Sequence, residues 1–212
     1  MNRPILLYIT TASLFIPPIT GIYRWKALDA SMKFFAVFCL YTLIHTIVEM
    51  ALGMNGINNH FLLHYYTLVE FSSIMFIYYQ FFTSQKVLQQ ITFFTGILFV
   101  VLWWYDNAYF VDPKKFDDFI STVSQVILTL FSFIVLQRLY QHASPSITQY
   151  SIFWIATAVL FCYTSTIIIM AMSNRLLEMG MGYFTIAWSI NWVFTIIANL
   201  LFTRSFFAKY FR

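Results

Sequence analysis

Hydrophobic residues are gathered into seven long runs, which short polar breaks separate. The runs cover about 4–23, 33–54, 60–83, 89–105, 117–138, 150–172 and 183–203. Most of them reach the roughly 20 residues that a helix needs to cross about 30 Å of hydrocarbon at a rise of 1.5 Å per residue. They lack the alternation of apolar and polar residues that is typical of a membrane barrel strand. The pattern therefore predicts an all-α, polytopic membrane protein: a single domain, residues 1–212, that forms a seven-transmembrane-helix bundle.

The first run contains a pair of prolines, Pro17 and Pro18. Proline has no backbone N–H and disturbs the helix that precedes it. We expect the pair to kink or end the first helix near its second membrane face, and a six-span arrangement is therefore an alternative. The longest break, about 106–116, is too short to form a domain outside the membrane.

Composition supports the membrane setting. Apolar residues make up 60% of the chain and charged residues only 9%, whereas soluble domains carry about 25% charged residues. The expected partner of the surface is therefore a lipid bilayer. The net charge of +4 comes from scattered basic residues rather than from one patch, so no nucleic-acid partner is predicted.

The basic residues indicate how the helices are oriented. Seven spans sort them into two sets, one on each side of the membrane. One set holds Arg24, Lys26, Lys33, Lys86, Arg138, Arg204, Lys209 and Arg212, and the other holds Arg3, Lys114, Lys115 and Arg175. Because Lys and Arg are enriched in cytoplasmic loops, the larger set predicts a cytoplasmic C-terminus and an N-terminus outside.

Ionisable residues interrupt the second and third runs: His45, Glu49, His60, His64 and Glu70. The short turn NGINN between the runs predicts that these two helices are antiparallel neighbours. Helix rise then places Glu49 at the depth of His64, and we expect the two side chains to meet in a polar recess on the outer side. At 100° per residue Glu70 lies to one side of His64, so we expect it to turn toward another helix.

Polar residues also recur at helical spacing in the fifth and seventh runs. Their spacing indicates that they face other helices rather than lipid. Between helices, their amide and indole N–H groups can contribute to a ligand pocket. The residues that we add to the predicted recess are Gln125, Trp188, Asn191 and Asn199.

Three interpretations of these polar residues remain open. They act as hydrogen-bonded clamps between helices, as a ligand pocket or proton path, or as metal ligands. The pairs His45/Glu49 and His60/His64 have a spacing that can present two ligands together, but His45 lies about 12 Å or more below His60 along the membrane normal. We therefore predict no metal site and no cofactor. Glu49, His60 and His64 are the candidates if a metal is bound.

Two segments, NNHFLLHYYTLVEF and YSIFWIATAVLFCYTS, resemble small seven-helix membrane proteins of unassigned function that are found in Bacteroidetes. The resemblance implies a location in the bacterial inner membrane and a multi-pass topology. It implies no activity and assigns no role to any residue.

The sequence lacks the motifs HExxH, GxSxG, CxxC and a glycine-rich phosphate loop, so no catalytic residue is predicted. We expect a membrane protein that binds a small ligand or a membrane protein partner and works in sensing or assembly. Two alternatives are a metal-dependent hydrolase that uses the His/Glu cluster and a small-solute or proton-coupled transporter.

Overall fold

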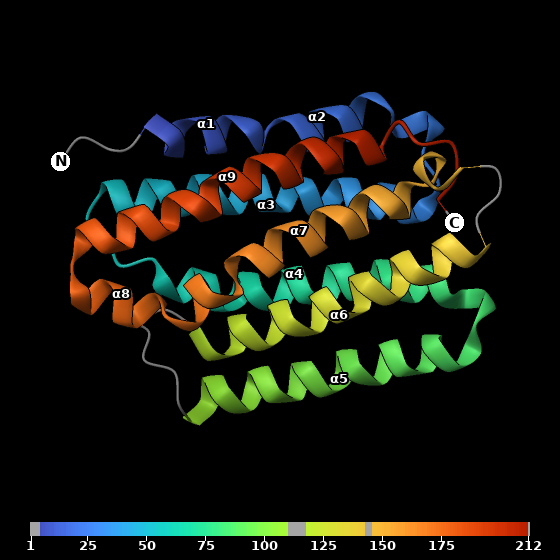
Figure 1. Ribbon diagram of the computed structural model, residues 1–212. Helices are drawn as coiled ribbons and strands as arrows, with labels where there is room; N and C mark the ends of the chain where they lie inside the picture. The colour runs from blue at the N-terminus through green and yellow to red at the C-terminus, as the bar shows by residue number, and fades with distance from the viewer. Residues whose placement is uncertain (1–4, 110–117, 143–145, 212) are drawn as a thin grey trace.

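The structure is a computed structural model that describes residues 5–109, 118–142 and 146–211. Within these residues seven helical segments are long and apolar enough to cross a membrane (Figure 1). They are Ile5–Tyr23, Ala30–Met54, His60–Ser84, Lys86–Tyr109, Asp118–Gln141, Ser151–Ala171 and Met181–Ser205. The predicted all-α chain with seven membrane-length helices is confirmed. The starts of two predicted spans, at residues 4 and 117, lie outside the described residues.

The described helices number nine, because one span is broken and one connection is helical. They are α1 (Ile5–Ser13), α2 (Ile16–Tyr23), α3 (Ala30–Met54), α4 (His60–Phe81), α5 (Lys86–Tyr109), α6 (Asp118–His142), α7 (Ser151–Ala171), α8 (Ser173–Met179) and α9 (Met181–Ser205). Short 3-10 turns occur at η1 (Trp25–Ala27), η2 (Phe82–Ser84) and η3 (Ile147–Gln149).

The helices run up and down, and neighbours in space are often not neighbours in sequence (Figure 1). Helix α7 packs against both α6 and α9, and α9 also packs against α1 and α2. Helix α4 contacts α3, α5 and α6, whereas α5 packs mainly against α4 at one edge of the bundle. This arrangement brings α1, α3, α4, α6, α7 and α9 around one interior space.

The first span is broken at a different place from the one expected. Helix α1 ends at Ser13 and α2 begins at Ile16, so the break falls in the middle of the span, ahead of Pro17 and Pro18. Both prolines lie in the first turn of α2, where a backbone N–H would have no helical acceptor and its loss costs little. The two short helices together still form one span of membrane length.

Other helix ends follow local sequence signals. The Asp29 side chain accepts a hydrogen bond from the backbone N–H of Met32 and caps α3. The turn after α3 contains Gly56 at φ +71°, and α9 follows Gly180 at φ +119°; glycine adopts such positive φ values without steric cost. Helix α8 occupies a break in the hydrophobic pattern and was not predicted.

The core of the bundle is rich in buried aromatic rings. Phe71 of α4 stacks on Phe99 of α5 with 3.7 Å between ring centroids. Tyr78 and Ser132 are both fully buried, and their hydroxyls are 2.6 Å apart. The chain after α9 turns back onto the start of α7, where the Ser151 N–H donates to the Tyr210 carbonyl at 2.7 Å.

One end of the bundle carries most of the described basic residues, and several of them lie over aromatic rings. The Lys33 ammonium is 5.9 Å from the ring centre of Trp25, and the Arg204 guanidinium is 5.3 Å from that of Trp154. Aromatic and basic side chains of this kind are typical of a membrane interface, where both an apolar and a polar environment are within reach.

A polar cavity inside the bundle as the candidate site

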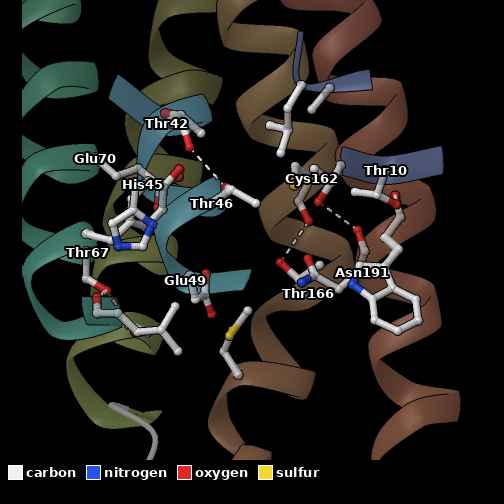
Figure 2. Close-up of a pocket in the computed structure, with 18 of the residues that line it drawn as sticks. Thr10, Thr42, His45, Thr46, Glu49, Thr67, Glu70, Cys162, Thr166 and Asn191 are labelled. Atoms are coloured by element: carbon white, nitrogen blue, oxygen red, sulfur yellow. Dashed lines mark hydrogen bonds between the residues drawn. The ribbon is translucent and has the colours of Figure 1, made fainter. Parts of the chain in front are cut away.

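A cavity of about 510 Å³ lies among α1, α3, α4, α6, α7 and α9 (Figure 2). Its lining begins at Gly53 and Asn59, beside the turn between α3 and α4, and continues to Ile74 of α4 and Phe202 of α9. The fifteen residues of α4 from His60 to Ile74 correspond to about 22 Å of helix. The cavity therefore reaches from one end of the bundle well past the middle of the membrane-spanning region.

Helical spacing explains why polar side chains gather here. On α3, Thr42, His45, Thr46 and Glu49 recur at intervals of three or four residues, so they share one face. All four line the cavity (Figure 2). Their face is directed toward the bundle interior.

Helix α9 supplies a second polar face from the opposite side of the cavity. Trp188, Asn191, Thr195 and Asn199 follow each other at intervals of three or four residues and all line the cavity. Gln125 reaches it from α6. The recess predicted between the second and third spans is therefore larger than expected, because α1, α6, α7 and α9 also form its walls.

The structure brings eight of the nine predicted site residues to this one cavity. They are His45, Glu49, His60, Glu70, Gln125, Trp188, Asn191 and Asn199. The ninth, His64, is buried but does not belong to the cavity lining. The indole N–H of Trp103 on α5 donates to the His64 carbonyl at 2.8 Å, so this turn of α4 packs against α5. The cavity lining therefore does not bring Glu49 and His64 together.

Glu70 lies at the centre of a hydrogen-bonded cluster. The Tyr66 hydroxyl donates to Glu70 Oε1 at 2.9 Å, and the Tyr163 hydroxyl of α7 is a second partner of the same carboxyl group. The His45 ring packs on Tyr66 with 4.7 Å between centroids, and His45 Nε2 is 3.1 Å from the Leu62 carbonyl. The cluster joins α3, α4 and α7 at a depth of ten residues, about 15 Å, below the start of α4.

Other polar residues of the lining are paired between helices. Asn199 Nδ2 donates to the Ser13 hydroxyl at 2.9 Å and connects α9 to α1. The Thr166 hydroxyl donates to Gln125 Oε1 at 3.3 Å and connects α7 to α6. These bonds tie together helices that are far apart in sequence.

Several polar groups of the lining, Gln125 and Glu49 among them, have bonding capacity that the described protein does not use. Gln125 is only 6% exposed, and its amide nitrogen has no hydrogen-bond partner among the described residues although its oxygen does. The Glu49 carboxylate likewise has no hydrogen bond among these residues; only its backbone carbonyl is bonded, by Asn59 Nδ2 at 2.8 Å. Glu49 projects into the space between α3 and α7 (Figure 2). Both groups are available to a molecule in the cavity.

The charge character of the cavity follows from its lining. Two glutamates and two histidines face it, and the described lining contains no lysine or arginine. Hydroxyl and amide groups account for much of the rest, together with the rings of Phe184, Trp188 and Trp192. The cavity therefore offers hydrogen-bond acceptors and aromatic faces, but no permanently positive side chain.

Within the described part of the chain, no group of three or more His, Cys, Asp or Glu side chains has an arrangement that could hold a metal ion. Glu49, His60 and His64 do not form such a group. Structural and catalytic zinc sites use about three or four protein ligands around one ion.

Sequence reasoning missed the contributions of the first and sixth spans. Thr10 and Ser13 of α1 and Tyr163 of α7 take part in the polar contacts of the cavity region. Apart from apolar side chains, their own runs contain mainly hydroxyl side chains, and no pattern marked these residues among them. The remaining signal is that hydroxyl side chains in membrane helices tend to face other helices.

The fold and its cavity define the class of this protein: it is an integral membrane protein, a seven-helix bundle with a polar interior. No protein-family model, curated protein or solved structure matches the chain.

Proposed function

We propose that this protein binds a small ligand in the cavity and acts as a sensing or assembly component, without catalysis of its own. The observation that carries the proposal is the unsatisfied amide nitrogen of Gln125 inside a cavity of about 510 Å³. Ligand sites usually measure about 300–1,000 Å³ and combine apolar walls with a few convergent polar groups.

Polar groups that are enclosed in a protein need hydrogen-bond partners. Most of them are hydrogen-bonded in folded proteins, and leaving one unsatisfied costs about 1–3 kcal/mol. A ligand or ordered water that bonds to Gln125 and Glu49 removes this cost. A ligand that also covers the aromatic rings gains from apolar burial, which water does not provide.

The proposed location is a bacterial inner membrane, with the N-terminus outside and the C-terminus in the cytoplasm. Support comes from the eight-to-four distribution of basic residues and from the resemblance to small seven-helix proteins of Bacteroidetes. Arg3, Lys114, Lys115 and Arg212 lie outside the described residues. In this orientation the end of the cavity near Gly53 and Asn59 faces the outer side.

The test is native mass spectrometry of the protein released gently from its own membrane. We expect a bound small molecule in the wild-type protein and its loss in Thr46→Phe, where a ring would occupy the cavity. Thr164→Phe is the matched control, because Thr164 is exposed on α7 and outside the lining. Both threonines bond to the carbonyl four residues earlier. The proposal is contradicted if no molecule co-purifies and a metabolite library changes the thermal stability of wild type and Thr46→Phe equally.

Transport is a second candidate function, and the depth of the cavity favours it. Glu49 lies five residues from the end of α3 and Glu70 ten residues from the start of α4, so two carboxyl groups face one cavity at different depths. Intramembrane carboxyl groups arranged in this way occur in proton-coupled carriers. Uptake of solute into proteoliposomes, driven by a proton gradient, would establish transport, whereas binding without uptake favours the sensing or assembly role.

The hydrolase alternative requires a metal centre. Elemental analysis of purified protein tests it directly: stoichiometric zinc that is lost in folded Glu49→Ala and His60→Ala variants would replace our proposal with the enzyme.

A further inference from the structure

The charge of the cavity restricts what it can bind. An anionic ligand needs positive side chains to replace its hydration shell, and the described lining contains neither lysine nor arginine. Glu49 and Glu70 supply carboxyl oxygens instead, and hydroxyl and amide groups surround them. The lining is therefore suited to a ligand that donates hydrogen bonds and carries positive charge.

The two carboxyl groups differ in how much of their bonding capacity is used. Glu70 already accepts a hydrogen bond from Tyr66 and interacts with the Tyr163 side chain. The Glu49 carboxylate has no hydrogen bond within the described residues and projects into the cavity (Figure 2). Five residues separate Glu49 from Met54 at the end of α3, which is about 8 Å of helix. Glu49 therefore lies near the end of the cavity beside the α3–α4 turn and can act as the counter-charge for a cation.

Aromatic rings stand at a comparable depth on the other side of the cavity. Trp188 lies seven residues, about 10 Å, from the start of α9, and this helix begins at the end of the bundle where α3 ends (Figure 1). Its ring stacks with Phe184, with 4.6 Å between centroids and 20° between planes. A cation over the face of such a ring is attracted by the negative charge density of the ring face. Farther in, Phe38, Ile74 and Phe202 offer apolar contacts.

From this juxtaposition of Glu49 and the aromatic faces of α9, we infer that the ligand is a small organic cation: an amine or ammonium compound with an apolar body. Its charged nitrogen lies beside Glu49 at the mouth, and its apolar body extends inward between α3 and α9. This inference rests on the proposed function, because it specifies the ligand class of the same cavity. Binding the cation holds Glu49 in its charged form, since an adjacent positive charge stabilises a carboxylate.

The test compares an aromatic amine with a neutral molecule of nearly the same shape. Binding of phenethylamine, tryptamine and benzyltrimethylammonium, and of 2-phenylethanol as the neutral counterpart of the first, is measured by calorimetry on full-length protein in nanodiscs of uncharged lipid. We expect the three cations to bind about 10-fold or more tightly than the alcohol. Phenethylamine and tryptamine gain a charge-assisted N–H···O bond to Glu49, whereas benzyltrimethylammonium, which has no N–H, gains the charge attraction and the contact with the aromatic rings. Glu49→Gln should remove this preference and leave the weak binding of the alcohol unchanged.

The control is Glu178→Gln, because Glu178 is exposed on α8 at the same end of the bundle and outside the lining. Preference for amines that is lost in Glu49→Gln and retained in Glu178→Gln supports the inference. Equal or tighter binding of the alcohol overturns it, and so does a preference that survives Glu49→Gln. Failure of all three amines to bind also overturns it. In each of these cases the proposed function is still judged separately, by the molecule that co-purifies with wild type and Thr164→Phe but not with Thr46→Phe.

Discussion

The close approach of α2 to α3 at Gly21 gives the sharpest test of the fold. A Cβ atom added at Gly21 of α2 would lie 2.6 Å from the Cβ of Ala36 on α3 and 3.3 Å from the ring of Phe206. Non-bonded carbon atoms prefer about 3.5–4.0 Å. Gly21→Ala therefore forces α2 away from α3, at a position where Ala36 and Phe206 are themselves buried.

Two opposing effects set the size of the change. Alanine gains about 1 kcal/mol over glycine in helix propensity, whereas overpacking of a tight core costs about 1–3 kcal/mol. The shortest contact is between two Cβ atoms fixed to helix backbones, and no flexible side chain can move aside. We therefore expect an overpacking cost in the upper part of this range, about 2–3 kcal/mol. After the gain in helix propensity is subtracted, Gly21→Ala should lower the free energy of unfolding by about 1–2 kcal/mol.

The measurement is the free energy of unfolding in mixed detergent micelles titrated with SDS. Gly96→Ala on α5 is the matched control, because nothing lies within 4 Å of its added Cβ; it should stabilise the protein by about 0.4–1 kcal/mol. Adding Ala36→Gly to Gly21→Ala removes the clashing methyl group and should recover part of the loss. If Gly21→Ala stabilises the protein as much as Gly96→Ala does, α2 and α3 do not approach each other as closely as described.

Three further predictions concern topology and hydrogen bonds. Reporter fusions at the C-terminus and in the 106–116 loop, most of which lies outside the described residues, should report opposite sides of the membrane; equal signals would refute the predicted orientation. Tyr163→Phe removes a partner of Glu70 and should lower the free energy of unfolding by about 0.5–1.5 kcal/mol. Asn199→Ala should lower it by about 0.6–1.7 kcal/mol, and a double-mutant cycle with Ser13→Ala should show coupling; independent effects would mean that α1 and α9 are not bonded there.

The seven spans could be predicted because the bilayer imposes a length and an apolar surface on each helix. The fourth run and the 173–179 segment show the limits of this signal. The fourth was the shortest run, 89–105, yet α5 extends over Lys86–Tyr109, because polar residues at an interface remain helical without being hydrophobic. Conversely, the 173–179 segment reads as a polar break, but its backbone forms α8. Hydrophobicity locates the membrane, not the ends of helices.

Eight residues of the cavity lining could be named from the sequence, but the shape of the cavity could not. Helical spacing shows which polar residues share a face, but it does not say toward which helix that face turns. The predicted Glu49–His64 pair assumes that α3 and α4 contact only each other. In the bundle α4 is enclosed by α3, α5 and α6, and the turn that contains His64 is bonded to Trp103 of α5. Contacts among helices that are distant in sequence decide toward which neighbour the polar face of each helix turns.

The clamp and the pocket interpretations of the intramembrane polar residues describe different members of one set. Tyr78 with Ser132 and Asn199 with Ser13 are closed pairs, because the two side chains bond to each other between helices. Glu49 and the Gln125 amide nitrogen are open, because the described protein offers them no partner. Removing a member of a closed pair should reduce stability and leave ligand binding intact. Removing an open group breaks no hydrogen bond within the described residues, so its effect should fall on binding, and stability should stay about the same.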